Sequence, residues 1–188
     1  MMGLRVLYKP EVIARRVRQL GRDISRDYRG KTVDVVGVVE NGYVFLADLV
    51  RALTVPVRTH FIRTETRDIV DPNTGKPRQE IFYTPEIDVA GKNILLVDGI
   101  VHTGITHDFL LRRMHLRNPK TVKVAVLVDK VAERRVLLEP DYFGFQLASN
   151  DVVIGYGLSR DGMSGNLPYL AKAARSGSSK AKAKKRKK

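Results

Sequence analysis

The chain has 188 residues, a length that suits one domain with a substantial buried core. Its formal net charge is +14 and it has no cysteine, which excludes disulfide scaffolds, thiolate zinc sites and cysteine nucleophiles. No apolar stretch is long enough to span a membrane and the N-terminus lacks the layout of a signal peptide, so we expect a cytoplasmic protein with no membrane contact.

Helices and strands are expected to alternate through residues 11–62. Val12, Val17 and Ile24 belong to a set of apolar residues at helical spacing, and Pro10 suits the first turn of that helix. A β-branched run follows, and Glu40-Asn41-Gly42 reads as a turn. The expected elements are a helix over 11–28, a strand over 33–39, a helix over 43–53 and a strand over 55–62.

A polar segment interrupts this alternation between Thr64 and Pro85. Within it, Asp71-Pro72-Asn73-Thr74-Gly75 is a strong turn signal. A loop or hairpin of this length in a compact domain is usually a functional flap or is mobile. We therefore expect a flap at this place.

One later segment has the layout of a phosphate-binding strand, turn and helix. Ile94–Val97 is short, continuous and apolar, as in a buried parallel strand. A turn at His102–Thr106 leads into a helix that begins near His107, where unpaired backbone N–H groups and the helix dipole favour an anion. Gly104 lets the backbone approach that anion, so a phosphate is the expected ligand. The alternative is an ordinary turn capped by one of its threonines.

The remaining elements complete an α/β pattern. Strands that alternate with helices predict a parallel sheet, whose ligands lie at the carboxyl ends of the strands. The later elements are expected to be a helix over 107–116 and strands over 122–128, 142–146 and 152–155.

The end of the chain differs in composition from the rest. Residues 171–188 carry nine Lys or Arg and no acid, and the run from Ser176 to Lys188 has no apolar pattern. Such a segment cannot bury enough surface to offset its ordering entropy, so we expect a domain over 1–170 and a disordered basic tail over 171–188. The tail suits RNA, a ribosome or another polyanion, or it is a solubilising extension.

Six segments, in order from about residue 5 to 170, together resemble hypoxanthine-guanine phosphoribosyltransferases. The resemblance implies the type I phosphoribosyltransferase fold, in which a parallel sheet is flanked by helices and carries a flap or hood hairpin. The six segments are Val36–Val39, Gly42–Arg51, Ile94–Thr106, Leu127–Lys130, Glu139–Phe145 and Gly155–Leu158.

The family exchanges the pyrophosphate of phosphoribosyl pyrophosphate for a purine base with Mg²⁺, and its members commonly form homo-oligomers. The resemblance implies that Thr103, Gly104, Ile105 and Thr106 form the loop that holds the 5′-phosphate. It also implies that Asp98 meets the ribose hydroxyls and, through them, the metal ion.

Two further positions match the purine-binding residues of the family. Lys130 matches the lysine that donates a hydrogen bond to the exocyclic oxygen of the purine, and Val153 the residue whose backbone contacts the base. Without the resemblance, Lys130 reads as a solvated lysine at a strand end and Val153 as a core residue.

The sequence departs from the family where the chemistry takes place. The family has two adjacent acids and, three residues after the second, an aspartate that assists proton transfer at the purine. This chain has Asp98, then Gly99 and His102 in the other two places. Glycine offers magnesium no ligand, whereas histidine can act as a base near neutral pH or donate a hydrogen bond to phosphate.

Other departures affect the pyrophosphate and metal side. Glu40 and Asn41 stand where the family has a Lys-Gly pair or similar, which places an anion opposite pyrophosphate. At about 4 Å two like charges repel by up to roughly 4 kcal/mol at an effective dielectric near 20. Ser159 and Gly165 replace an aspartate and an arginine of the family, and Glu65-Thr66 replaces the Ser-Tyr pair of its flap.

Three functions are consistent with this pattern. The first is a family member that keeps a purine-nucleotide pocket, has lost or weakened the transfer reaction and therefore needs no cofactor, and meets RNA through its tail. The second is an active purine salvage enzyme in which His102 is the base and Asp98 and substrate oxygens hold Mg²⁺. The third is an RNA- or ribosome-associated module with an unused pocket.

Overall fold

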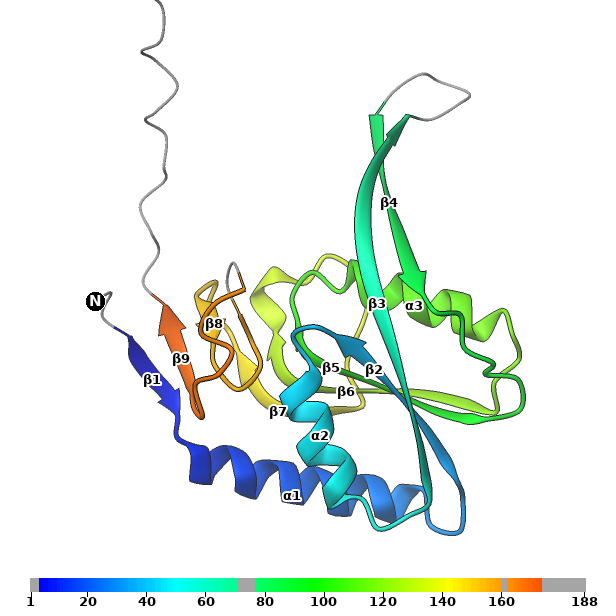
Figure 1. The fold of residues 1–188 in the computed structure, drawn as a ribbon, viewed down its shortest axis with the longest axis horizontal. Coiled ribbons are helices and arrows are strands. Elements are labelled where there is room, and N and C mark those ends of the chain that lie inside the picture. The colour runs from blue at the N-terminus through cyan, green and yellow to red at the C-terminus, as the bar shows by residue number, and fades with distance from the viewer. Residues whose placement is uncertain (1–3, 71–76, 160–161, 174–188) are drawn as a thin grey trace, which may run out of the picture.

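The computed structural model describes residues 4–70, 77–159 and 162–173. Its centre is a six-stranded sheet with the order β4-β3-β2-β5-β6-β7 (Figure 1). Neighbouring strands are parallel except for β3 and β4, so the expected α/β fold with a mostly parallel sheet is confirmed. The strands are β2 (Val33–Val39), β3 (Val57–Val70), β4 (Pro77–Thr84), β5 (Asn93–Val101), β6 (Thr121–Lys130) and β7 (Tyr142–Leu147).

Helices pack on both faces of this sheet. Successive side chains of a strand point to opposite faces, so Val35 and Leu95 join one core and Val36 and Leu96 the other. The first core also contains the buried residues of two helices and the second those of the third helix. These helices are α1 (Pro10–Asp27), α2 (Tyr43–Ala52) and α3 (Ile105–His115), and a short 3-10 helix, η1 (Val131–Glu133), follows β6.

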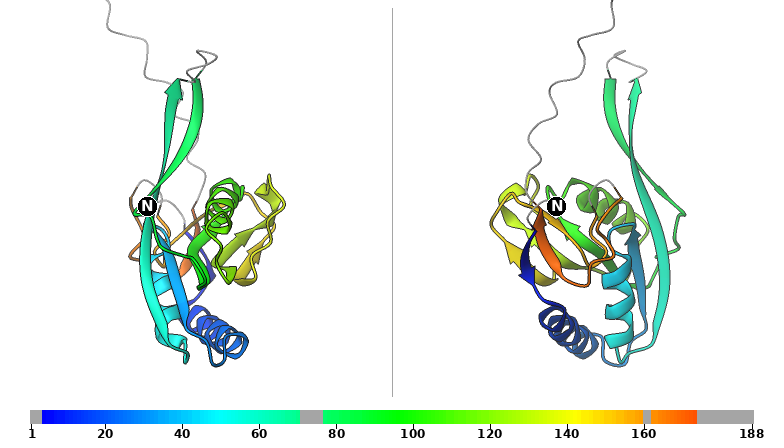
Figure 2. Two further views of the ribbon diagram at one scale, coloured as in Figure 1. Left: turned by 90° about the vertical axis from the view of Figure 1, so that its right-hand side faces the viewer. Right: turned by 60° about the vertical axis from the view of Figure 1, so that its left-hand side comes forward.

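Strands β3 and β4 form a long antiparallel hairpin that extends beyond the body of the domain (Figure 2). Arg63 is paired with Thr84 near its base and Val70 with Pro77 at its outer end. The strand expected to end at Ile62 therefore continues to Val70, because backbone pairing with β4 extends it through a polar sequence. The turn signal at 71–75 lies outside the described residues.

A second, three-stranded sheet joins the two ends of the domain. Its order is β1-β9-β8, and its pairs are antiparallel. Strand β8 (Val152–Ile154) matches an expected strand, whereas β1 (Arg5–Tyr8) and β9 (Leu170–Ala173) have no strand signal of their own. Strand β9 extends three residues beyond residue 170, where we expected the domain to end, and the chain from 174 onward lies outside the described residues.

Among the described residues, no helix is both long enough and apolar enough to cross a membrane.

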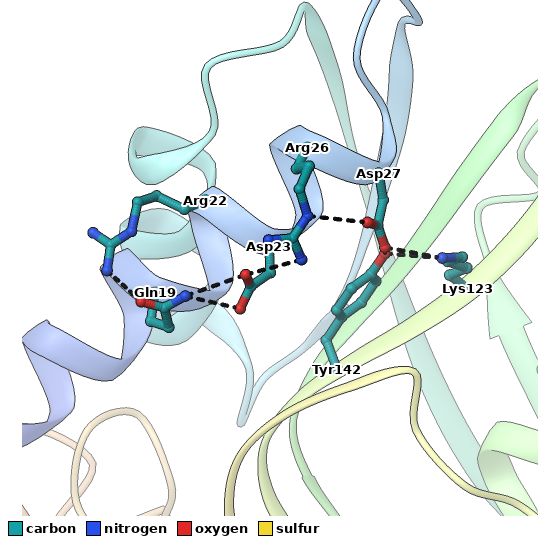
Figure 3. Close-up of polar contacts among 7 residues, drawn as sticks. All are labelled: Gln19, Arg22, Asp23, Arg26, Asp27, Lys123 and Tyr142. Atoms are coloured by element: carbon teal, nitrogen blue, oxygen red, sulfur yellow. Dashed lines mark hydrogen bonds and ion pairs between the residues drawn. The ribbon is translucent and has the colours of Figure 1, made fainter.

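A polar cluster fastens the end of α1 to strands β6 and β7 (Figure 3). The hydroxyl of Tyr142 donates a 2.7 Å hydrogen bond to Oδ2 of Asp27, and Nζ of Lys123 lies 3.0 Å from that hydroxyl and 3.3 Å from the same carboxylate oxygen. The hydrogen bond from Tyr142 is the main cause that lowers the pKa of Asp27, while burial raises the pKa of Tyr142. The tyrosine therefore stays protonated as a donor.

We expect Tyr142→Phe to reduce the free energy of unfolding by about 1–2 kcal/mol near neutral pH, because a hydrogen bond to a charged group is lost. The difference from the wild type should shrink as the pH falls below 3.8, the ordinary pKa of this carboxyl group, since the stability conferred by a lowered pKa is lost on protonation. Urea unfolding at several pH values measures both effects. Tyr169→Phe is the control, and equal losses in the two variants would contradict the assignment.

Candidate functional site

A cleft of about 320 Å³ opens at the carboxyl ends of the parallel strands β2 and β5. This is the edge at which ligands of open α/β sheets bind. Most of the expected phosphate and ribose residues meet there, together with the loop after β2. The cleft is lined by Val38, Val39, Glu40, Asn41, Thr64, Asp98, Ile100, His102, Thr103, Gly104, Thr106 and His107.

The turn before α3 is tight and centres on Gly104. Gly104 has a φ of 80°, a left-handed conformation that favours glycine, and the helix begins directly after it at Ile105 rather than near His107. An added Cβ at Gly104 would lie only 2.8 Å from Cγ2 of Val136. Thr103 Oγ1 accepts a 3.4 Å hydrogen bond from the backbone N of Ile105. The N-cap residue of α3 is Gly104, and no side chain caps the helix there.

Asp98 lines the cleft and has a histidine partner that the sequence did not predict. Its Oδ1 accepts a 2.6 Å hydrogen bond from the backbone N of Gly99, and its Oδ2 lies 3.0 Å from Nε2 of His107. Both side chains are largely buried, and the ring nitrogen is not aligned for a hydrogen bond with any described residue. The available signal was spacing, because His107 shares the buried face of α3 with Leu110 and Met114.

His102 is linked to Lys130 through Glu133, a second residue that the sequence analysis missed. Nδ1 of His102 lies 3.5 Å from Oε2 of Glu133, and Nζ of Lys130 donates to Oε1 of the same carboxylate. Burial is the main cause that lowers the pKa of His102, Lys130 lowers it further, and Glu133 opposes both. The imidazole is therefore neutral at neutral pH, as a proton acceptor must be.

The two expected purine-binding residues do not line the cleft. The side chain of Lys130 is only 2% exposed and bonds to Glu133, so it is not a solvated lysine at a strand end. Val153 is buried in β8 and belongs to the core that also contains the α1 and α2 residues. Lys130 is thus connected to the cleft through Glu133 and His102 rather than directly.

The loop after β2 packs closely against Gly99. An added Cβ at Gly99 would overlap the carbonyl oxygen of Asn41 and lie 2.7 Å from Cδ2 of Leu158. The side-chain oxygen of Asn41 in turn accepts hydrogen bonds from the backbone N and hydroxyl of Ser159, at 3.4 and 3.3 Å. Gly99, Asn41 and Ser159 therefore form one packed unit, although they are far apart in the sequence.

The charge of Glu40 is partly balanced. Oε1 of Glu40 lies 3.4 Å from Nη2 of Arg63 on β3, and both side chains are mostly exposed. The repulsion between this glutamate and a pyrophosphate is accordingly well below the upper estimate for an unscreened pair.

The described residues offer a magnesium ion few protein ligands. No group of three or more His, Asp or Glu side chains within them is arranged to hold a metal ion. Asp98 and Glu40 are the carboxylates that line the cleft, whereas Asp129 pairs with Arg134. This donor set fits an ion that reaches the site on substrate oxygens, with Asp98 as its protein contact, since Mg²⁺ often binds through one carboxylate and substrate phosphates.

Comparison with known proteins gives consistent matches. The family described as phosphoribosyl transferase domain matches residues 6–161. The chain is 35% identical over 172 residues to the hypoxanthine-guanine phosphoribosyltransferase of Aquifex aeolicus, covering 89% of this chain and 93% of that protein. It is 30% identical over 166 residues to the bifunctional protein TilS/HprT of Listeria innocua, but spans only 25% of that protein's length.

Solved structures agree with these matches. A hypoxanthine-guanine phosphoribosyltransferase from Bacillus anthracis superimposes with a TM-score of 0.78 at 29% identity, covering 93% of this chain and 99% of that one. A hypoxanthine phosphoribosyltransferase from Trypanosoma cruzi, in a ternary substrates complex, gives a TM-score of 0.81 at 29% identity, with coverages of 93% and 96%.

We expect Gly99→Ala to lower the free energy of unfolding by about 1–3 kcal/mol, because the methyl group has no space beside the Asn41 carbonyl. Gly165→Ala is the matched control, since an added Cβ there meets nothing closer than 3.3 Å. Thermal and urea unfolding measure the difference. Equal stability of the two variants would show that the loop after β2 does not pack on Gly99.

Proposed function

The chain belongs to the hypoxanthine-guanine phosphoribosyltransferase family, and from this premise we propose that it binds a purine nucleotide and transfers the phosphoribosyl group slowly or not at all. The observation that carries the proposal is the packing of the Asn41 carbonyl against Gly99, which occupies the space of the second acid. Restoring that acid by mutation would therefore require the loop to move.

The phosphate end of the cleft supports nucleotide binding. The backbone N–H groups at the start of α3 face the turn made by Thr103 and Gly104, and the positive end of the helix dipole favours a phosphate there. Asp98 lines the same cleft, where its carboxylate can accept hydrogen bonds from ribose hydroxyls. In this arrangement the 5′-phosphate and ribose occupy the open part of the site.

Binding of a purine base would require Lys130 to change its hydrogen-bond partner. For Lys130 to donate to the exocyclic oxygen of a purine, its ammonium group must exchange the Glu133 carboxylate for that oxygen. Glu133 would then remain in contact with His102. Binding of the base thus replaces one hydrogen bond of a buried cation with another, which keeps the cation satisfied.

The transfer reaction needs charge neutralisation at the pyrophosphate and removal of a proton from the purine. A magnesium ion bound to phosphoribosyl pyrophosphate would supply the first, with Asp98 as its protein contact. The chain itself opposes pyrophosphate through Glu40, and it replaces the aspartate that assists proton transfer with His102. Loss of a general base typically lowers a rate by about 10²–10⁴-fold.

Two measurements test this proposal together. With phosphoribosyl pyrophosphate, Mg²⁺ and hypoxanthine or guanine, we expect turnover well below about 1 s⁻¹, the lower end of the ordinary enzyme range. Calorimetric titration with GMP or IMP should nevertheless detect binding. Thr106→Val should weaken that binding by about tenfold through loss of a phosphate hydrogen bond, whereas Thr59→Val, outside the cleft, should not. Fast turnover, or no binding at millimolar GMP, would overturn the proposal.

A second candidate is an active purine phosphoribosyltransferase with His102 as the base. The contact between Nδ1 of His102 and Glu133 favours it, because a carboxylate that holds one ring nitrogen orients the other toward a reacting group. The lowered pKa of His102 also keeps the ring in its proton-accepting form.

For this candidate we expect Glu133→Gln to lower the pKa of His102 further, since the carboxylate opposes the effects of burial and of Lys130. The rate should fall as the pH drops below the pKa of His102, and in the variant this fall should begin at a lower pH. Rate–pH profiles and NMR titration of the imidazole measure the two effects. If the fall in rate at low pH begins at the same pH in the variant although the pKa of its imidazole has changed, His102 is not the base.

We also propose that the basic residues 171–188 contact RNA or a ribosome. In a third candidate function this contact is the role of the protein and the pocket is unused. RNA affinity is expected to fall steeply with salt and to drop when residues 176–188 are deleted. Filter binding at several salt concentrations measures both. Unchanged affinity in the truncated protein would show that the tail is not the binding element.

Assembly as a homo-oligomer is likewise a proposal, which light scattering tests.

A further inference from the structure

A second hollow, of about 450 Å³, lies between α1 and α2 and shares no lining residue with the cleft. Helix α2 crosses α1 at an angle, and its C-terminal end lies against α1 (Figure 1). We call it the arginine groove. Its lining residues are Ala14, Val17, Arg18, Arg22, Asp48, Arg51, Ala52 and Tyr156.

The arginine groove carries more positive than negative charge. Three guanidinium groups line it, from Arg18 and Arg22 on α1 and Arg51 on α2, against the one carboxylate of Asp48. Arg18 and Arg22 are four residues apart, so they lie on the same helix face, where like charges destabilise a helix unless a counter-charge is present. An anion placed between the two helices would relieve this repulsion.

The hydrogen bonds around the groove leave much of its positive charge without a negatively charged partner. Nη2 of Arg51 donates a 2.7 Å hydrogen bond to Oδ1 of Asp48. Arg22 donates to the side-chain oxygen of Gln19, which is neutral (Figure 3). Arg18 forms no hydrogen bond or ion pair with any residue in the part of the chain that the structure describes. Two of the three guanidinium groups therefore have no carboxylate partner within the described ranges.

Tyr156 and Asp48 line the groove and are joined by a hydrogen bond. The hydroxyl of Tyr156 donates to Oδ2 of Asp48, and burial raises the pKa of Tyr156, so it remains a neutral donor. Ala14, Val17 and Ala52 add apolar wall. A concave site of this volume, with apolar walls and a few charged groups, has the size and composition of a small-molecule site.

Arginine forks recognise phosphate oxygens through paired hydrogen bonds. We propose that the arginine groove binds a small molecule that carries a polyphosphate group. Arg18 and Arg22 take the phosphate oxygens, Arg51 exchanges part of its contact with Asp48 for the ligand, and the apolar wall contacts whatever organic group the polyphosphate carries. The concave shape favours a small ligand over an extended nucleic acid.

The first experiment measures binding of inorganic tripolyphosphate to the full chain by calorimetry at physiological salt. The double variant Arg18→Ala/Arg22→Ala should bind at least about tenfold more weakly, the loss of one charged hydrogen bond or more. The control Arg15→Ala/Arg29→Ala removes the same charge from exposed positions that do not line the groove, and it should bind like the wild type. Equal affinity in the two double variants would overturn the proposal.

Two further readouts locate the ligand and identify its source. Hydrogen exchange should slow in α1 and α2 on addition of tripolyphosphate, and protection confined to residues 171–188 would overturn the proposal. A nucleoside triphosphate that binds more tightly than tripolyphosphate shows that the apolar wall takes an organic group, and equal affinities show recognition of phosphate alone. GMP binding in the cleft should be the same in both double variants, so this test is separate from that of the proposed function.

Discussion

The close contact between the Asn41 carbonyl and Gly99 is the packing constraint on which one side of the cleft depends. It brings the loop after β2 onto the end of β5, and the hydrogen bonds from Ser159 hold the Asn41 side chain to the segment that follows β8. Residues from three distant parts of the chain thus pack together at one edge of the sheet. The turn at Gly104 lines the same cleft, and its left-handed glycine precedes α3 directly.

Much of the fold follows from local patterns. The buried strands β2 and β5 and the amphipathic helix α1 have strong periodic signals, and their expected bounds agree with the structure to within a few residues. The short strands β1 and β9 could not be predicted, because they form only through pairing between the two ends of the domain. The extent of β3 likewise depends on its partner β4 rather than on its polar sequence.

The site was predictable where a backbone motif defines it and unpredictable where side chains from different elements meet. The turn from Thr103 to Thr106 is a local motif, and most of its residues line the cleft as expected. Glu133 and His107 were missed because their roles depend on tertiary contacts, with Lys130 and His102 in one case and Asp98 in the other. The same contacts explain why Lys130 is buried beside the cleft rather than open to it.

The small sheet also determines what the far end of the chain is attached to. In that sheet Val153 is paired with Lys172, and β9 ends at Ala173. A partner bound by residues that follow Ala173 would therefore pull on the strand that neighbours Val153. Tension on β9 would reach β1 and β8 directly, because both are hydrogen-bonded to it in the small sheet. The small sheet therefore couples β9 mechanically to β1, at the other end of the described chain, as well as to β8.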